Sequence, residues 1–376
     1  MTGFEARQLA ADKITSQTGT TATLDYSTAQ ARTGAASFRI HPASGVAGFL
    51  TFPATSGYFH FSLYVAALPS VDRVIWGSTA AGTANIRLTN TGNLAYYIAT
   101  TLLGTTNTTP FAATGWHWVG IYDWGGFGLS DLLVVDGAVL INADPDSQLT
   151  VSTTVIGCSG TEATACDIYI DDVIVDSTNL LAPSKVDIAL PISDNTVTGV
   201  TTNAGGTTNL WDCVNNTPPA GVASASEAAA GAVSIKYPAS ATENYIANLE
   251  TYTTLGIGGF DTILAVQPLV RHGEDSATGT KNLQNVGALT NPTYGGASAV
   301  AGLDGGAHGA ESGANFWTVT SGFLASPSVT LNQSPTIQTS RISEARVACI
   351  DFMGMMVAWT PTRVPKTSPY PQLLAQ

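Results

Sequence analysis

Short apolar runs separated by Gly, Asn, Ser and Thr recur along this chain from residue 21 onward. Their spacing is close to the roughly 8 to 12 residues typical of strands in sandwiches and barrels. In the first half we expect strands at 37–40, 47–52, 58–65, 73–76, 85–88, 94–99, 116–122, 132–135, 138–141, 151–156 and 167–175. In the second half we expect them at 232–237, 245–247, 262–270, 316–320, 328–332 and 345–359, with Gly354 as the point where the last would break. The pattern predicts an all-β protein.

The low charge content excludes several further classes of protein. Only 11% of the residues are charged, whereas the hydrophobic fraction is 44%; soluble proteins usually carry about 25% charged residues. Normal apolar content with little charge argues against intrinsic disorder and against a long helical rod. With 14 Lys and Arg against 27 Asp and Glu, the net charge is −13. This balance argues against nucleic-acid binding, which needs local positive charge.

The length of 376 residues suggests two domains at about 150 residues each. Asn and Pro residues interrupt the strand pattern near 180–185. We therefore predict two β-sandwich (jelly-roll-like) domains, at 21–181 and 182–360, with extended terminal arms at 1–20 and 361–376. The second arm is rich in proline, which resists helix and central strand. Residues 1–20 lack a signal-peptide pattern, and we find no apolar run long enough for a membrane span.

Three segments of the first half, in order, carry a resemblance. They are 114–123 (TGWHWVGIYD), 132–140 (LLVVDGAVL) and 167–175 (DIYIDDVIV). They resemble the "Gly-Trp-His-x-Val" strand, the "Val-Asp-Gly" hairpin and the closing strand of concanavalin-like jelly rolls, the laminin-G and lectin group. Asp-Gly between apolar runs independently predicts a tight hairpin at 135–138. The resemblance implies a fold, since this fold hosts lectins, adhesion modules, glucanases and viral coat parts.

The second half resembles tailed-phage virion structural proteins at 186–191, 263–267 and 346–357. This resemblance implies a structural component of a bacteriophage virion, attached to tail or capsid and contacting other virion proteins and copies of itself. It would be made and assembled in the host cytoplasm and end in the virion. A low-charge surface suits such packing, because it reduces the cost of desolvating charges at contacts.

No catalytic set is visible in the sequence. Glucanases of the concanavalin-like group use Glu-x-Asp-x-Glu on a strand, and none of the eight Glu fits that pattern. Neither a Gly-x-Ser-x-Gly elbow nor a phosphate-binding loop is present. The five His are not spaced as metal ligands. We therefore expect no enzyme activity and no cofactor.

The resemblance to lectin and laminin-G proteins raises the question of a calcium site, because these proteins often bind Ca²⁺ through Asp and backbone oxygens. Asp144 and Asp146 lie in one loop and are the weak calcium candidates. Asp171 and Asp172 are adjacent, so on a regular strand they would point to opposite faces. We expect no resident metal ion.

A carbohydrate-binding adhesin contacting host-surface glycans is the alternative function. It rests on the jelly roll and on aromatic residues, with Trp76 and Trp124 as the candidate glycan contacts and Trp116 and Trp317 as further aromatic candidates. Trp116 and Trp118 fall on one face of their strand. Packing and a sugar-stacking platform remain open for that pair.

Two cysteines, Cys158 and Cys166, flank a Gly-Thr loop. They are either small buried thiols or the two halves of a disulfide across a hairpin. None of the four cysteines has Cys-x-x-Cys spacing, so a zinc or redox motif is not indicated.

Overall fold

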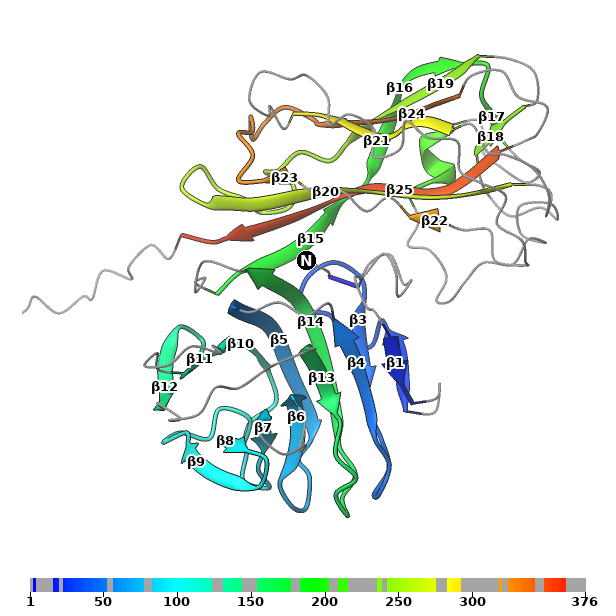
Figure 1. Ribbon diagram of the computed structural model, residues 1–376. Coiled ribbons are helices and arrows are strands. Elements are labelled where there is room, and N and C mark those ends of the chain that lie inside the picture. Colours follow the sequence, from blue (N-terminus) through cyan, green and yellow to red (C-terminus); the bar gives the residue numbers. More distant parts are fainter. Residues whose placement is uncertain are drawn as a thin grey trace, which may run out of the picture.

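The structure is a computed structural model. It describes residues 3–4, 16–19, 23–52, 57–77, 83–123, 131–143, 154–176, 183–202, 209–215, 235–238, 242–274, 283–291, 318–319, 324–341 and 348–362. The all-β prediction is confirmed: these residues form two pairs of antiparallel sheets, and their helical structure is a single 3-10 turn, Trp211–Cys213. The two sandwich-like domains lie end to end, the first below the second in Figure 1.

The first domain packs two seven-stranded sheets face to face. One sheet has the order β1 (Ser16–Thr18), β4 (Gly48–Phe52), β13 (Thr154–Cys158), β6 (Arg73–Gly77), β7 (Ala84–Leu88), β8 (Leu94–Ile98) and β9 (Thr101–Thr105). The other has the order β12 (Ala138–Ala143), β11 (Asp131–Val135), β10 (Trp116–Asp123), β5 (Gly57–Ala67), β14 (Asp167–Asp176), β3 (Ser37–Ile40) and β2 (Leu24–Ser27). This is the jelly-roll sandwich that the first resemblance implies.

Alternation along the strands explains this packing. On β5, Phe59, Phe61, Leu63 and Val65 point into the space between the sheets and are buried in the core. Side chains two residues apart share a face of a strand, so the residues between them line the outside. The predicted Asp-Gly hairpin joins β11 to β12, and both Asp136 and Gly137 have the positive φ that such a turn needs, 52° and 86°.

Residues 3–4 and 16–19, the described part of the predicted arm at 1–20, pack on the first domain. Phe4 is fully buried in the core and lies against the rings of Tyr26 and Phe38. Strand β1 pairs with β4. Most of the 361–376 arm lies outside the described residues.

The second domain pairs a seven-stranded sheet with a four-stranded one. The larger contains β15 (Lys185–Ala189), β17 (Thr201–Thr202), β18 (Ile235–Tyr237), β20 (Thr262–Glu274), β22 (Thr318–Val319), β23 (Leu324–Ala325) and β25 (Ala348–Thr360). The smaller has the order β16 (Pro191–Thr198), β19 (Glu243–Leu249), β24 (Thr336–Arg341) and β21 (Leu283–Thr290).

Two strand predictions in this domain were wrong. Strand β25 continues through Gly354, where the absence of a side chain admits Ile188, since a Cβ there would lie 2.8 Å from Ile188 Cδ1. The strand expected at 328–332 is irregular apart from a single bridge residue, and the strand beyond it, β24, was missed. Ile337 is the only apolar residue of β24, and its other buried positions are Thr339 and Arg341, so the strand has almost no apolar signal.

Candidate functional site on the outer face of the first domain

The outer face of the sheet that contains β5, β10 and β14 carries the densest set of aromatic and charged side chains. On β10, Trp116, Trp118 and Gly120 share this face, as predicted, while Val119 and Ile121 point into the core. Strand β14 starts at Asp167 and runs to Asp176, toward the second domain (Figure 1). The start of β14 therefore marks the half of the face that lies further from the second domain.

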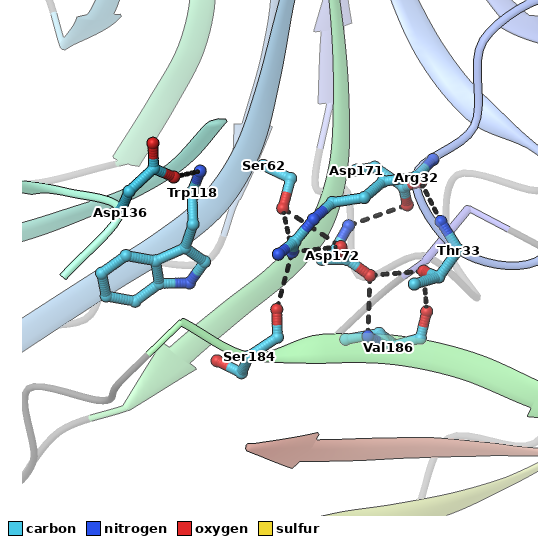
Figure 2. A network of polar contacts seen from close by, with 9 residues as sticks. All are labelled: Arg32, Thr33, Ser62, Trp118, Asp136, Asp171, Asp172, Ser184 and Val186. Carbon is cyan, nitrogen blue, oxygen red and sulfur yellow. Dashed lines mark hydrogen bonds and ion pairs between the residues drawn. The ribbon is translucent and has the colours of Figure 1, made fainter. Parts of the chain in front are cut away.

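The half near the second domain holds a buried set of hydrogen bonds, here called the proximal network (Figure 2). Its members are Arg32, Thr33, Ser62, Asp171, Asp172, Ser184 and Val186. Arg32 Nη1 donates to Asp172 Oδ2 at 2.7 Å and to the Ser184 carbonyl at 2.7 Å. Because Ser184 precedes β15, the network joins the two predicted domains.

Asp172 is the centre of this network. Its side chain is fully buried and also accepts hydrogen bonds from the Thr33 hydroxyl at 2.6 Å and the Val186 amide at 2.7 Å. The single proton of the Thr33 hydroxyl is shared between Asp172 Oδ1 and the Val186 carbonyl. Burying a carboxylate is costly unless charged and hydrogen-bonding partners replace water. Here a guanidinium, a hydroxyl and an amide replace it.

The expectation that Asp171 and Asp172 point to opposite faces was wrong. The pairing of β14 with β5 shifts register between Asp171 and Ile174, and Asp172 has a positive φ of 50°. This bulge turns both carboxylates toward one loop: Asp171 accepts from the Arg32 amide at 2.8 Å, and Asp172 binds the Arg32 side chain. Bulges re-aim side chains in this way.

Trp118 lies beside the proximal network and is 1% exposed. Its indole stacks on the His60 imidazole, with centroids 5.2 Å apart. Gly120 provides the space, because a Cβ there would come within 2.8 Å of the Trp118 ring. The Trp118 ring is therefore part of a closed packing arrangement.

The half of the face further from the second domain carries a line of side chains, here called the distal row, which are partly exposed except for Tyr169, which is 6% exposed. Its members are Trp116 on β10, Tyr64 on β5, Tyr169 on β14, Arg39 on β3 and Asp25 on β2. Each is the direct register partner of the next across five neighbouring strands. The Tyr64 ring lies 5.6 Å from that of Trp116 and 5.9 Å from that of Tyr169.

The polar end of the distal row is built from the Arg39–Asp167 ion pair and a His41–Asp25 hydrogen bond. Arg39 makes a bidentate pair with Asp167, in which Nε donates to Oδ1 at 2.9 Å and Nη2 donates to Oδ2 at 2.8 Å. The Arg39 guanidinium also lies 5.6 Å from the centre of the Tyr169 ring. The hydrogen bond to Asp167 raises the pKa of Arg39. Burial raises the pKa of Tyr169. His41 Nε2 lies 2.9 Å from Asp25 Oδ1.

This arrangement offers flat apolar ring surfaces followed by hydrogen-bonding groups. Trp and Tyr rings combine large apolar faces with a polar edge, and few rotamers must be frozen when a ligand packs on them. Trp116 and Tyr64 are partly exposed. The row can therefore stack the C–H faces of sugar rings and bind their hydroxyl groups at its polar end.

The other predicted site residues are placed as follows. Trp76 is 2% exposed and packs between the sheets with Ile86 and Ile156, which leaves no ring face for a glycan. Trp124, Trp317, Asp144 and Asp146 lie outside the described residues. Cys158 and Cys166 are both buried free thiols, and burial and the hydrogen bond to Cys158 raise the pKa of Cys166.

The described part of the chain was also considered for metal ligands and for membrane-spanning helices. No group of three or more His, Cys, Asp or Glu in that part is arranged to hold a metal ion. The same part contains no helix that is long and apolar enough to cross a membrane.

Comparison with known proteins finds distant likeness in structure. No family model matches the chain, and no curated protein matches it. An endo-β-1,4-glucuronan lyase from the fungus Trichoderma reesei matches with TM-score 0.34 and 13% identity, over 44% of this chain and 91% of the lyase. A carbohydrate esterase of the Shiga toxin-encoding bacteriophage phi24B matches with TM-score 0.31 and 15% identity, over 42% and 87%.

The alginate lyase Aly36B matches with TM-score 0.25 and 11% identity, over 36% of this chain and 79% of that one. This is a distant similarity to jelly-roll carbohydrate-active enzymes, without membership of a specific family. At such values it concerns the fold of part of the chain and assigns no activity.

Proposed function

We propose that this chain is a structural protein of a tailed-phage virion and that its first domain contacts glycans through the distal row. The observation that carries the glycan contact is the row itself. The partly exposed rings of Trp116 and Tyr64 and the buried ring of Tyr169 are in direct register and lead to the Arg39–Asp167 ion pair and the His41–Asp25 hydrogen bond. Convergent ring faces and a few oriented polar groups are what ligand sites commonly combine.

The test of glycan contact is binding of the purified chain to a glycan array, followed by calorimetry with the best oligosaccharide. We expect Tyr64→Ala and Trp116→Ala each to weaken binding about tenfold, which corresponds to about 1.4 kcal/mol. Tyr97→Ala is the matched control. Tyr97 is a partly exposed tyrosine on the other sheet that also lies against an arginine, with Arg87 4.2 Å from its ring centre. Equal losses in all three variants would refute a site at the distal row.

The virion assignment is supported by the low-charge composition, by the resemblance of the second half, and by the junction between domains. There Ile174 of β14 packs with Val186, Ile188, Leu269, Phe352, Met356 and Ala358 of the second domain. Together with the proximal network, this apolar cluster suits a protein that must hold one domain out from a particle. Mass spectrometry of purified particles should find the chain in stoichiometric amount, and finding it only as a free protein in infected cells would refute the assignment.

We also propose that the first domain binds glycans without cleaving them. Of the two carboxylates at the distal row, Asp167 is in an ion pair with Arg39 and Asp25 is hydrogen-bonded to His41. General acid–base chemistry on a glycosidic bond uses a pair of carboxyl groups that flank the bond with separated pKa values. Incubation of the chain with the bound oligosaccharide should yield no shorter products by mass spectrometry. Products that disappear in Asp167→Asn would overturn this proposal.

A further inference from the structure

The side chains of the distal row indicate which class of glycan the row can bind. This inference rests on the glycan contact proposed above. Its aromatic side chains lie on the central strands β10, β5 and β14, and its charged side chains lie at the edge, on β3 and β2. Neighbouring strands are about 4.8 Å apart, so the five-strand row extends about 19 Å across the sheet. A ligand that touches both ends must be longer than one sugar ring.

The charges at the polar end determine what such a ligand can carry. Arg39 is the guanidinium of the row, and two of its N–H groups already bind Asp167 at 2.9 and 2.8 Å. Asp25, the direct register partner of Arg39, adds a second carboxylate, which His41 faces at 2.9 Å. A carboxylate on the ligand would lie beside one guanidinium that is already paired with Asp167 and beside two carboxylates.

Hydroxyl groups suit this end better than carboxylates. The carboxylate oxygens of Asp25 and Asp167 accept hydrogen bonds, and the remaining N–H groups of Arg39 donate them. A uronate would have to be desolvated beside like charges, which is unfavourable. The net charge of −13 adds a repulsive background for acidic polymers.

We propose that the distal row binds an uncharged linear oligosaccharide lying across the strands and discriminates against uronate-containing glycans. The partly exposed rings of Trp116 and Tyr64 stack the sugar rings, and the buried Tyr169 ring packs edge-on against Tyr64. The Arg39–Asp167 pair binds hydroxyl groups of the same chain further along and excludes carboxylates.

The test uses the full chain and two probe series on an array and in calorimetry: neutral gluco-, manno- and galacto-oligosaccharides of one to six units, and oligouronates of the same lengths. We expect affinity for at least one neutral series to rise at least tenfold from one unit to four, and to change less than twofold between low and high salt. Binding of uronates should be at least tenfold weaker. Uronate binding equal to or tighter than neutral binding, or no dependence on length, would overturn the inference while leaving glycan contact intact.

A charge variant separates this inference from the function on which it rests. Asp167→Asn removes one carboxylate and releases Arg39, so uronate affinity should rise about tenfold or more. Asp72→Asn is the matched control, because Asp72 pairs with Tyr97 on the other sheet. Melting temperatures check that both variants are folded. An unchanged uronate affinity in folded Asp167→Asn would contradict the role of the pair, whereas failure of the native chain and of Asp167→Asn to bind any glycan would refute the proposed function itself.

Discussion

Two arginine–aspartate pairs lie on the same outer face of the first domain, and they differ mainly in their surroundings. Arg32 and Asp172 approach to 2.7 Å, and Arg39 and Asp167 to 2.8 Å. The side chain of Asp172 is 0% exposed, whereas that of Asp167 is 25% exposed. The first pair is enclosed by the loop that carries Thr33 and by the start of the second domain.

The difference teaches that burial, more than ion-pair geometry, decides what a polar group contributes. In the proximal network, the hydrogen bonds of Asp172 join two domains and leave no room for a ligand. In the distal row, water still competes for Arg39 and Asp167, so their pairing adds little stability. A ligand can displace that water. The two halves of one face are thus specialised, one for rigidity and one for contact.

The largest expected effect is that of Asp172→Ala. The substitution leaves the Arg32 guanidinium and the Val186 amide without their acceptor in a mostly buried position. Breaking a buried pair by removing one partner costs about 3 to 5 kcal/mol, and we expect about 3 because Arg32 is partly exposed. Chemical unfolding monitored by tryptophan fluorescence measures this. A loss below about 1 kcal/mol would contradict the structural role of the network.

A second expected effect concerns the enclosure of Trp118. In Gly120→Ala the new Cβ would come within 2.8 Å of the indole, and overpacking of this kind costs about 1 to 3 kcal/mol. Gly115→Ala is the matched control. Gly115 directly precedes β10, and the nearest contact of a Cβ there would be 3.9 Å away, at His117 Nε2. Thermal unfolding should separate the two variants. Equal stability would show that the Trp118 ring is free to move.

A third prediction uses pH at the domain junction. Burial, together with the negative charges of Asp172 and Glu250, raises the pKa of Asp187 to about 6. A carboxyl group whose pKa is higher in the folded than in the unfolded state destabilises the fold when it is ionised. This penalty is present in full above about pH 6 and is lost as pH falls toward the ordinary value of about 4.

Asp187→Asn should therefore stabilise the protein at pH 8 by roughly 1 to 2 kcal/mol and have little effect at pH 4.5. Because Asp187 keeps some access to water, the gain is smaller than the full pKa shift would give. Thermal unfolding of both proteins at the two pH values checks this. A stabilisation that is the same at both values would contradict the assigned cause.

The smallest expected effect is that of Asp167→Ala on stability. Exposed ion pairs contribute about 0 to 1 kcal/mol, so this variant should unfold within about 1 kcal/mol of the native chain. Measured beside Asp172→Ala, it tests the comparison directly. Similar losses in the two variants would mean that burial does not distinguish the pairs.

The sequence predicts much of this fold because period-two patterns are local. It placed Trp116 and Trp118 on one face and the Asp-Gly turn at Asp136, and the structure confirms both. It could not assemble the distal row, because Tyr64, Tyr169 and Arg39 come from strands that are far apart in the chain. Register between such strands is set by tertiary packing, which single-strand alternation does not encode.

The two halves of the face were indistinguishable in sequence for a related reason. Trp116 and Trp118 have the same alternation, and only the loop that carries Arg32 and the start of the second domain enclose the region around Trp118. The bulge that re-aims Asp172 also has no local signal, since a positive φ at a non-glycine residue depends on the contacts that stabilise it. Likewise, Trp76 was a glycan candidate because its aromatic character alone does not reveal burial.

The most direct test of the division between the two halves is an NMR titration of the tryptophan indole N–H signals with the tightest-binding neutral oligosaccharide. Trp116→Phe and Trp118→Phe variants identify the two signals. The account predicts that the Trp116 signal shifts in proportion to occupancy while the Trp118 signal stays in place. A bound oligosaccharide that leaves Trp116 unmoved, or that shifts Trp118 instead, would contradict it.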